Sequence, residues 1–179
     1  VNGIIDEKTL AKIEQLTTPP FQKGESHESI KQVKKDLNRL GFNGILVTSY
    51  FGSFTEKRVR EFQSYYGLEV DGIGGETTLT KIDEVLNSTY QLGKSDDGLK
   101  SIKEDLNTLG YGPIVVTSYF GGYMESQVRQ FQEDQGLAVN GTVDVPTLNL
   151  IENHINTPLR KGKSHQHTVR LKRALNKLG

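Results

Sequence analysis

The sequence lacks several residue types on which common protein chemistries depend. Its 179 residues include no cysteine, no tryptophan and a single methionine. Without cysteine the chain has no disulfide framework, no thiolate-ligated zinc and no cysteine nucleophile. It also lacks an excess of charge, because 22 Lys and Arg balance 22 Asp and Glu. Nucleic-acid binding is usually accompanied by a basic excess or a basic stripe, so we expect no nucleic-acid partner.

Long apolar runs are missing as well. The longest are about five residues, far short of the roughly 20 that a bilayer-spanning helix needs, so no membrane partner is expected. Hydrophobic residues make up 34% of the chain and charged residues 25%, which suffices for small cores but is lean for one large core. The length allows one domain or a few small ones.

An internal repeat of 69 residues organises the chain. The segment Leu37–Gly41 (LNRLG) returns as Leu106–Gly110 (LNTLG) and again as Leu175–Gly179 (LNKLG). Between the two complete copies, roughly 29 of the 69 positions are identical without a gap. We therefore divide the chain into the end of one unit (1–22), two complete units (23–91 and 92–160) and the first helix of another (161–179). This division predicts an array that is cut at both ends.

Each complete unit shows three segments with helical spacing of apolar residues. In the first unit they cover residues 29–40, 53–66 and 76–87, and glycines follow the first two. No run alternates long enough to predict a sheet, although residues 45–47 could pair briefly as an extended segment. The fold class we predict is all-α, a tandem array of small three-helix units.

The turn before the third helix is typical of a helix start. Asp144 is a good N-cap residue, and Pro146 follows in the first turn, where its missing N–H costs nothing. Thr147 then lies near the third helical position, where its hydroxyl can reach back to the cap. The acidic residue and glycines of this turn are thus explained by backbone needs before any function is invoked.

Several short motifs recur in register in both complete units. In the first unit they are Leu37-Asn38-Arg39-Leu40-Gly41-Phe42, Phe51-Gly52, Val59, Phe62-Gln63, Gly67-Leu68, Val70-Asp71-Gly72 and Thr78-Leu79. This set resembles the peptidoglycan-binding domain-like family of three-helix repeats, found in bacterial cell-wall amidases and peptidases. The resemblance implies a non-catalytic wall-targeting module beside a murein hydrolase. Two departures are Thr48-Ser49, where the family often has Asp-Gly, and Met124 in place of the capping Thr55.

Catalysis within the chain is not expected. His165 and His167 look like a metal pair, but a catalytic zinc needs a third protein ligand. The equivalent positions in the second unit are Asp96 and Gly98, whereas a site required by every unit would keep its ligands. Carboxylate pairs lack a partner base, and there is no nucleophile-elbow signature. We predict no catalytic residues, no metal and no cofactor.

A candidate binding surface consists of polar and aromatic positions that both complete units share. Glycan binding favours flat aromatic surfaces and forked hydrogen-bond donors, and arginine suits muropeptide carboxylates. Structural roles are the alternative: Tyr50 could cover the core, Gln63 could bond a loop carbonyl, and Arg60 could pair with Glu56. The candidate ligand-binding residues are Asn38, Tyr50, Phe54, Arg60, Gln63, Asn107, Tyr119, Tyr123, Arg129 and Gln132.

The segments between units keep an apolar residue in phase, namely Phe21, Tyr90 or Leu159. A purely flexible tether would be rich in Gly and Ser and would not keep such a residue. We expect these residues to dock between neighbouring units and to set a semi-rigid array.

The function we predict is binding of cell-wall peptidoglycan, through the glycan strand or the stem peptide, by tandem repeats that target an attached hydrolase or surface protein. This places the chain outside the cell, in a Gram-positive wall. The expected partners are peptidoglycan, neighbouring repeat units and an appended hydrolase domain. The alternative is a structural or protein-docking repeat array, a spacer or holder of a neighbouring catalytic domain. A third is an enzyme whose catalytic domain lies outside this sequence.

Overall fold

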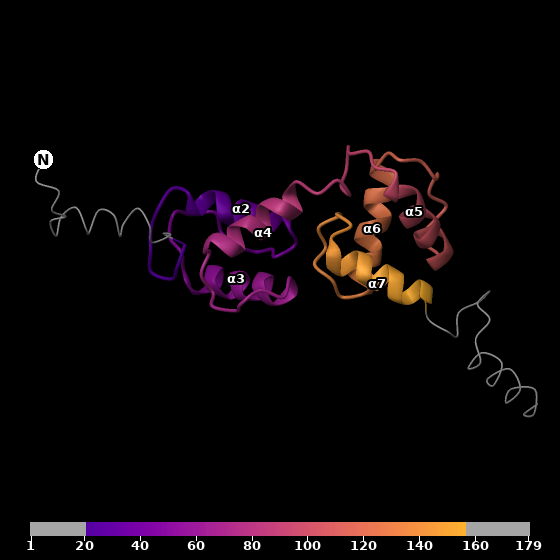
Figure 1. The fold of residues 1–179 in the computed structure, drawn as a ribbon. Coiled ribbons are helices and arrows are strands. Elements are labelled where there is room, and N and C mark those ends of the chain that lie inside the picture. Colours follow the sequence, from indigo (N-terminus) through magenta and orange to yellow (C-terminus); the bar gives the residue numbers. More distant parts are fainter. Residues whose placement is uncertain (1–20, 157–179) are drawn as a thin grey trace, which may run out of the picture. The chain divides into compact units, whose positions relative to one another are not determined.

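The computed structural model describes residues 21–156 and divides them into two units of three helices each (Figure 1). Residues 21–87 belong to unit 1 and residues 88–156 to unit 2. The predicted partial units, 1–22 and 161–179, lie outside the described residues apart from positions 21 and 22. His165, His167 and Leu159 lie outside them as well.

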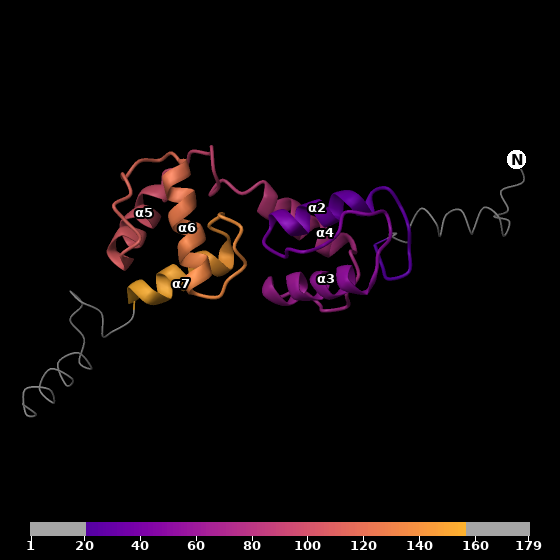
Figure 2. The same cartoon turned by 180° about the vertical axis from the view of Figure 1, so that it is seen from behind.

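Helices α2 and α3 of unit 1 and their counterparts lie where the apolar spacing predicted them. The bounds are α2 Ile30–Arg39, α3 Ser53–Tyr65, α4 Glu76–Leu86, α5 Gly98–Leu109, α6 Gly122–Asp134 and α7 Val145–Asn156. No strand occurs among residues 21–156, so the all-α class is confirmed. In both views α3 lies to one side of α2 and α4 (Figures 1 and 2), and α2 contacts both of them.

The extended segment behaves differently from the expectation. Residues 45–47 pair with no other backbone segment in the described structure. Instead each unit contains one isolated antiparallel bridge, Ser26 with Tyr50 in unit 1 and Ser95 with Tyr119 in unit 2. A side chain of α2 satisfies the backbone at residue 45, which removes the need for a strand partner there.

Each unit has its own hydrophobic core. In unit 1, Ile30 and Leu37 of α2 and Phe62 of α3 are all fully buried. The repeat places Leu99, Leu106 and Phe131 at the equivalent positions of unit 2, where they are also buried. Glycine ends the first helix in both units: Gly41 and Gly110 have φ of 93° and 98°, a left-handed conformation that other residues rarely adopt.

A buried glutamine fixes the turn between the second and third helices of unit 1. Gln63 is 1% exposed. Its Oε1 accepts a hydrogen bond from Gly72 N (2.8 Å), and its Nε2 lies within donor distance of Asp71 Oδ1 (2.6 Å), Ile73 O (3.0 Å) and Thr78 Oγ1 (3.0 Å). One side chain therefore ties α3 to the turn and to the first turn of α4.

Unit 2 repeats this arrangement around its own glutamine, with Asn140 in the place of Asp71. Gln132 Oε1 accepts from Asn140 N (3.1 Å) and Gly141 N (2.9 Å). Its Nε2 lies within donor distance of Asn140 Oδ1 (2.8 Å), Thr142 O (2.8 Å) and Thr147 Oγ1 (3.0 Å). The repeated polar position is thus explained by the fold.

The predicted helix start at Asp144 is confirmed. Asp144 Oδ1 accepts from the backbone N–H of Thr147 (3.0 Å) and from its hydroxyl (2.6 Å). These bonds satisfy one of the amide groups that the first turn of α7 leaves without an intrahelical partner.

The connector residues pack on the unit that follows them. Phe21 O accepts from Gly74 N (2.8 Å) within unit 1. Tyr90 O accepts from Val143 N (2.9 Å), and its ring packs against the core of unit 2. Their role in setting a semi-rigid array stays a prediction.

Replacing Gln63 by leucine tests the glutamine anchor. The variant Gln63→Leu keeps the volume but leaves buried N–H and C=O groups of the turn without partners, which costs about 2–4 kcal/mol of unfolding free energy. Urea denaturation measures this loss. The matched control is Gln32→Leu, since Gln32 is exposed on α2 and bonds only Asp36, and a surface change stays within about 0.5 kcal/mol. Equal effects of the two variants would contradict the anchor.

Candidate ligand-binding site

The first loop of unit 1, residues 42–52, is held in place by α2. Asn38 Nδ2 donates to Ile45 O (2.8 Å), and Ile45 N donates to Asn38 Oδ1 (3.0 Å). The amide side chain therefore acts as a backbone substitute, pairing with residue 45 as a neighbouring strand would. Asn107 makes the same pair of bonds with Ile114 in unit 2 (2.9 and 2.6 Å).

A second anchor of the loop is a buried lysine. Lys34 of α2 is 2% exposed, and its Nζ donates to Leu46 O (3.2 Å), Thr48 Oγ1 (2.9 Å) and Tyr50 O (2.6 Å). All three acceptors are neutral oxygens. Burial disfavours the charged form and lowers the pKa of Lys34 below its usual value.

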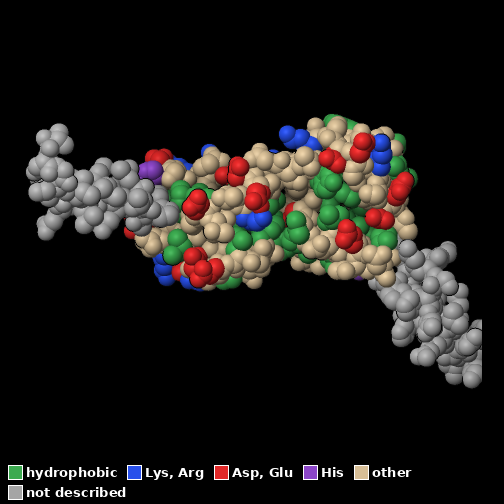
Figure 3. Space-filling model, viewed as in Figure 1, with side chains coloured by type: hydrophobic (Ala, Val, Ile, Leu, Met, Phe, Trp, Pro, Cys, Tyr) green, Lys and Arg blue, Asp and Glu red, His purple; other side chains and the backbone are tan. Residues whose placement is uncertain are grey.

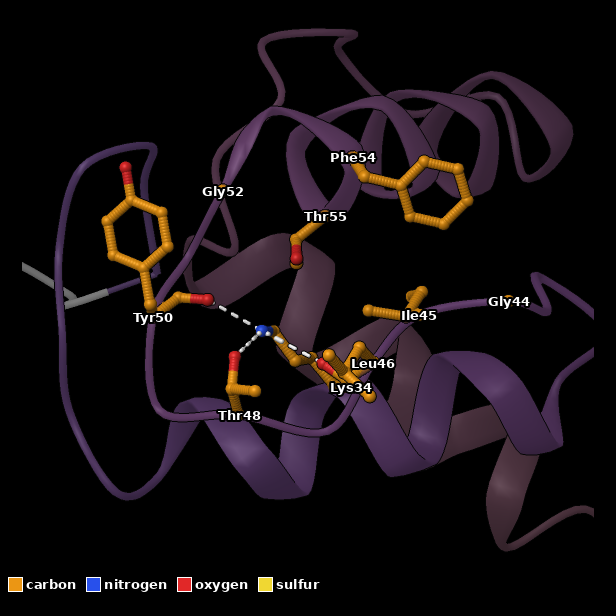
Figure 4. Close-up of a pocket in the computed structure, with 9 residues that line it drawn as sticks. All are labelled: Lys34, Gly44, Ile45, Leu46, Thr48, Tyr50, Gly52, Phe54 and Thr55. Carbon is orange, nitrogen blue, oxygen red and sulfur yellow. Dashed lines mark hydrogen bonds between the residues drawn. The ribbon is translucent and has the colours of Figure 1, made fainter.

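A shallow, open hollow of about 340 Å³ lies over this lysine. Tyr50 and Phe54 stand on opposite sides of it, and Lys34 and Thr48 lie beneath them (Figure 4). The remaining lining comes from the loop and the start of α3: Gly44, Ile45, Leu46, Gly52 and Thr55. Tyr50 is 52% exposed and Phe54 46%, so both rings present surface to solvent.

Phe54 is held by its own helix. The guanidinium of Arg58 lies over the Phe54 ring, 5.0 Å from its centroid, and Arg58 Nη1 donates to Glu61 Oε2 (2.6 Å). Cation–π contacts of this kind fix the orientation of an aromatic ring. Since Glu61 balances Arg58, the cationic character of the hollow comes from Lys34.

Unit 2 keeps most of this arrangement. Lys103 is 2% exposed, and its Nζ donates to Thr117 Oγ1 (2.9 Å) and Tyr119 O (2.6 Å). Burial lowers the pKa of Lys103 too. Tyr119 and Tyr123, at the positions of Tyr50 and Phe54, are about half exposed. Met124 replaces Thr55 and packs into the core of unit 2.

The ten candidate residues fall into four sets in the structure. The aromatic side chains Tyr50, Phe54, Tyr119 and Tyr123 are exposed. The glutamines Gln63 and Gln132 are buried and the turns use their amides, which is the structural role given above as the alternative. Asn38 and Asn107 hold the first loops. The arginines lie elsewhere on the second helix: Arg60 Nη1 donates to Val70 O (2.8 Å), and Arg60 and Arg129 pair with Glu56 and Glu125.

Sequence reasoning missed the buried lysines. Lys34 and Lys103 are identical in the two copies, and each lies four residues after an apolar core residue and three before another. A lysine at such a position on the apolar face of a helix is a signal, because burying an ammonium requires oxygen partners. Thr48 and Thr117, which supply a hydroxyl to each lysine, repeat in the same way.

The described residues show no group of three or more His, Asp or Glu side chains placed to bind a metal ion. Among those same residues, no helix has both the length and the apolar character for crossing a bilayer. On the face drawn in Figure 3, acidic and basic side chains are interspersed.

Comparison with known families fits this architecture. A family model described as "Putative peptidoglycan binding domain" matches the chain twice, over residues 26–82 and 95–151. These two segments cover more than half of the chain and follow the 69-residue period. The chain belongs to this peptidoglycan-binding family. Each match includes the first loop and the glutamine-anchored turn of one unit, and the match to residues 26–82 also includes the hollow.

Relatives of the chain include an amidase and a spore cortex-lytic enzyme. A stretch of 109 residues is 29% identical to the N-acetylmuramoyl-L-alanine amidase CwlM of Mycobacterium tuberculosis, covering 55% of this chain and 26% of the amidase. A stretch of 108 residues is 32% identical to the spore cortex-lytic enzyme of Oceanobacillus iheyensis, covering 58% and 38%.

A third relative is a protease. A stretch of 61 residues is 39% identical to a "Probable CtpA-like serine protease" of Staphylococcus epidermidis, covering 34% of this chain and 12% of the protease. The chain therefore spans between 12% and 38% of the length of these three relatives.

The loop anchor is tested by replacing Asn38 with alanine. Loss of both bonds to residue 45 costs about 1–3 kcal/mol locally, so amide exchange at Ile45 accelerates by roughly 10- to 100-fold. Hydrogen exchange followed by NMR measures it. The control is Asn43→Ala in the same loop, where Asn43 is exposed. Unchanged exchange at Ile45 in Asn38→Ala would show that the side chain does not hold the loop.

Proposed function

We propose that the chain is a non-catalytic module that binds peptidoglycan in the bacterial cell wall and brings an attached hydrolase to it. The family and the two wall-lytic relatives support this proposal. The matches cover only a minor part of each relative, which fits a module separate from the catalytic part. The chain acts outside the cell, in a wall of the Gram-positive type.

The observation on which the proposal rests is the aromatic rim of the hollow. Tyr50 with Phe54, and Tyr119 with Tyr123, present half-exposed rings from the first loop and the second helix of each unit. Exposed aromatic rings have apolar faces against which a ligand can stack. Flat rings beside polar donors suit the sugar faces and peptide groups of peptidoglycan.

Two sites in one chain strengthen binding to a polymer. After one unit binds, the second meets a high local concentration of ligand, so two weak sites give a tight overall attachment. The repeat therefore has a functional value beyond the stability of each unit, because each unit has its own core.

A protein-docking array is the second candidate. Leu46 and Val115, at equivalent positions beside the two lysines, are each 78% exposed. Exposed aliphatic side chains of this kind also suit contact with a neighbouring protein domain. Under this candidate, the chain would show no affinity for isolated wall material.

Removing the aromatic rim tests the proposed function. We expect the variant with Tyr50, Phe54, Tyr119 and Tyr123 changed to alanine to lose at least about tenfold in retention on purified sacculi, because both sites are affected. Cosedimentation with sacculi stripped of teichoic acid measures retention. Its thermal unfolding should change modestly, since the four side chains are half exposed.

The control replaces two exposed aliphatic residues away from the aromatic rim, Val70 and Leu92, by alanine. This variant should sediment like the unchanged chain. Loss of retention in both variants would indicate nonspecific hydrophobic adsorption to the sacculi. Full retention of the aromatic variant would place the binding site elsewhere. Failure of the unchanged chain to sediment would favour the docking array.

A further inference from the structure

We infer that the hollow binds a carboxylate with small apolar neighbours, the chemistry of a peptidoglycan stem peptide, rather than the neutral glycan strand. This inference rests on the proposed function and specifies its ligand. It follows from three features of the hollow: a buried cation, the uncapped start of a helix, and a hydroxyl whose proton is available for a hydrogen bond to a ligand.

The buried cation is Lys34. Its ammonium donates to two backbone carbonyls and one hydroxyl, and none of the described residues forms a salt bridge with it. None of the residues that line the hollow is acidic. Because no carboxylate balances this ammonium, its positive charge adds a field to the hollow that favours an anion.

The start of α3 adds to this field. The N-cap of α3 is Gly52, which has no side chain to accept from the first-turn amides. The hollow is lined by Gly52 itself and by Phe54 and Thr55 of that first turn. Helix N-termini have a partial positive charge and amide donors that favour anions. Glu56, the acidic residue of this turn, does not line the hollow and pairs with Arg60 and Lys23.

Thr48 supplies a directed hydroxyl donor. Its Oγ1 accepts from Lys34 Nζ, and an ammonium cannot accept in return. The hydroxyl proton is therefore available to a ligand oxygen, and Thr48 is exposed and lines the hollow. Ile45, Leu46 and Phe54 supply apolar walls on which a methyl group can pack.

This combination matches a stem peptide better than a sugar chain. Stem peptides contain free carboxylates next to alanine methyl groups, whereas the glycan strand presents hydroxyls and neutral acetamido groups. A ligand carboxylate accepts charge-assisted bonds, which are stronger than those of a neutral acceptor.

The same features recur in unit 2. Lys103 donates to Thr117 Oγ1, and the N-cap of α6 is Gly121. None of the salt bridges formed by the described residues includes Lys103. Both units are therefore expected to bind the same chemical group.

Chemical removal of the wall carboxylates tests the inference. The probe is teichoic-acid-free sacculi, used either untreated or after amidation of their carboxyl groups with carbodiimide and methylamine. We expect amidation to lower retention of the full chain by at least about fivefold. Equal retention on both preparations would overturn the inference while leaving peptidoglycan binding intact.

Variants connect this effect to the hollow. Thr48→Val combined with Thr117→Val removes only the two hydroxyls and should lower retention on untreated sacculi and reduce its sensitivity to amidation. Lys34→Met combined with Lys103→Met should show the larger loss, with circular dichroism reporting whether the fold is kept. The matched control is Lys35→Met, which removes one exposed lysine from the same helix.

These experiments distinguish failure of the carboxylate inference from failure of the proposed function. If the threonine variant retains its full sensitivity to amidation, the carboxylate binds elsewhere and the inference is wrong. If the unchanged chain binds only sacculi that keep their teichoic acid, the anion is a phosphate, and both the inference and the proposed function fail. No binding to either preparation would refute the proposed function itself.

Discussion

The ammonium of Lys34, buried among neutral oxygens, is the constraint on which the first loop and its hollow depend. A charge in such a position must be surrounded by acceptors, and residues 46, 48 and 50 supply them. The loop is consequently pulled onto α2, which leaves Tyr50 on one side of the hollow and Phe54 on the other. The same group that shapes the loop also gives the hollow its positive field.

The polar residues that repeat between units divide into scaffold and surface. Gln63 and Asn38 replace missing backbone partners, one at the turn between α3 and α4 and the other at residue 45. These hydrogen bonds explain why both units need them, without reference to a ligand. What remains at the surface is the aromatic pair, so repetition alone does not identify a binding residue. A repeated residue that is exposed and has no structural role is the better candidate for contact with a ligand.

The helices could be predicted because each has apolar residues three and four apart, and because two helices in each unit are followed by a glycine. The cap at Asp144 followed from local chemistry in the same way. Lys34 could not be placed, because its partners lie 12 to 16 residues away in a loop whose path no local pattern encodes. The sequence places Gln63 on an exposed face, whereas it is buried, for a related reason. Its spacing from Arg60 suggests a shared exposed face, but the following turn folds back over the glutamine.

The account's central claim is that peptidoglycan fragments bind between the first loop and the start of the second helix in each unit. An NMR titration of the isotope-labelled chain with soluble muropeptides tests it most directly. We predict that chemical-shift changes concentrate in residues 44–55 of unit 1 and 113–124 of unit 2, with the signals of Thr48 and Thr117 among the most affected. Changes confined to the glutamine-anchored turns or to the connector at residues 87–91, or no changes at saturating muropeptide, would contradict the claim.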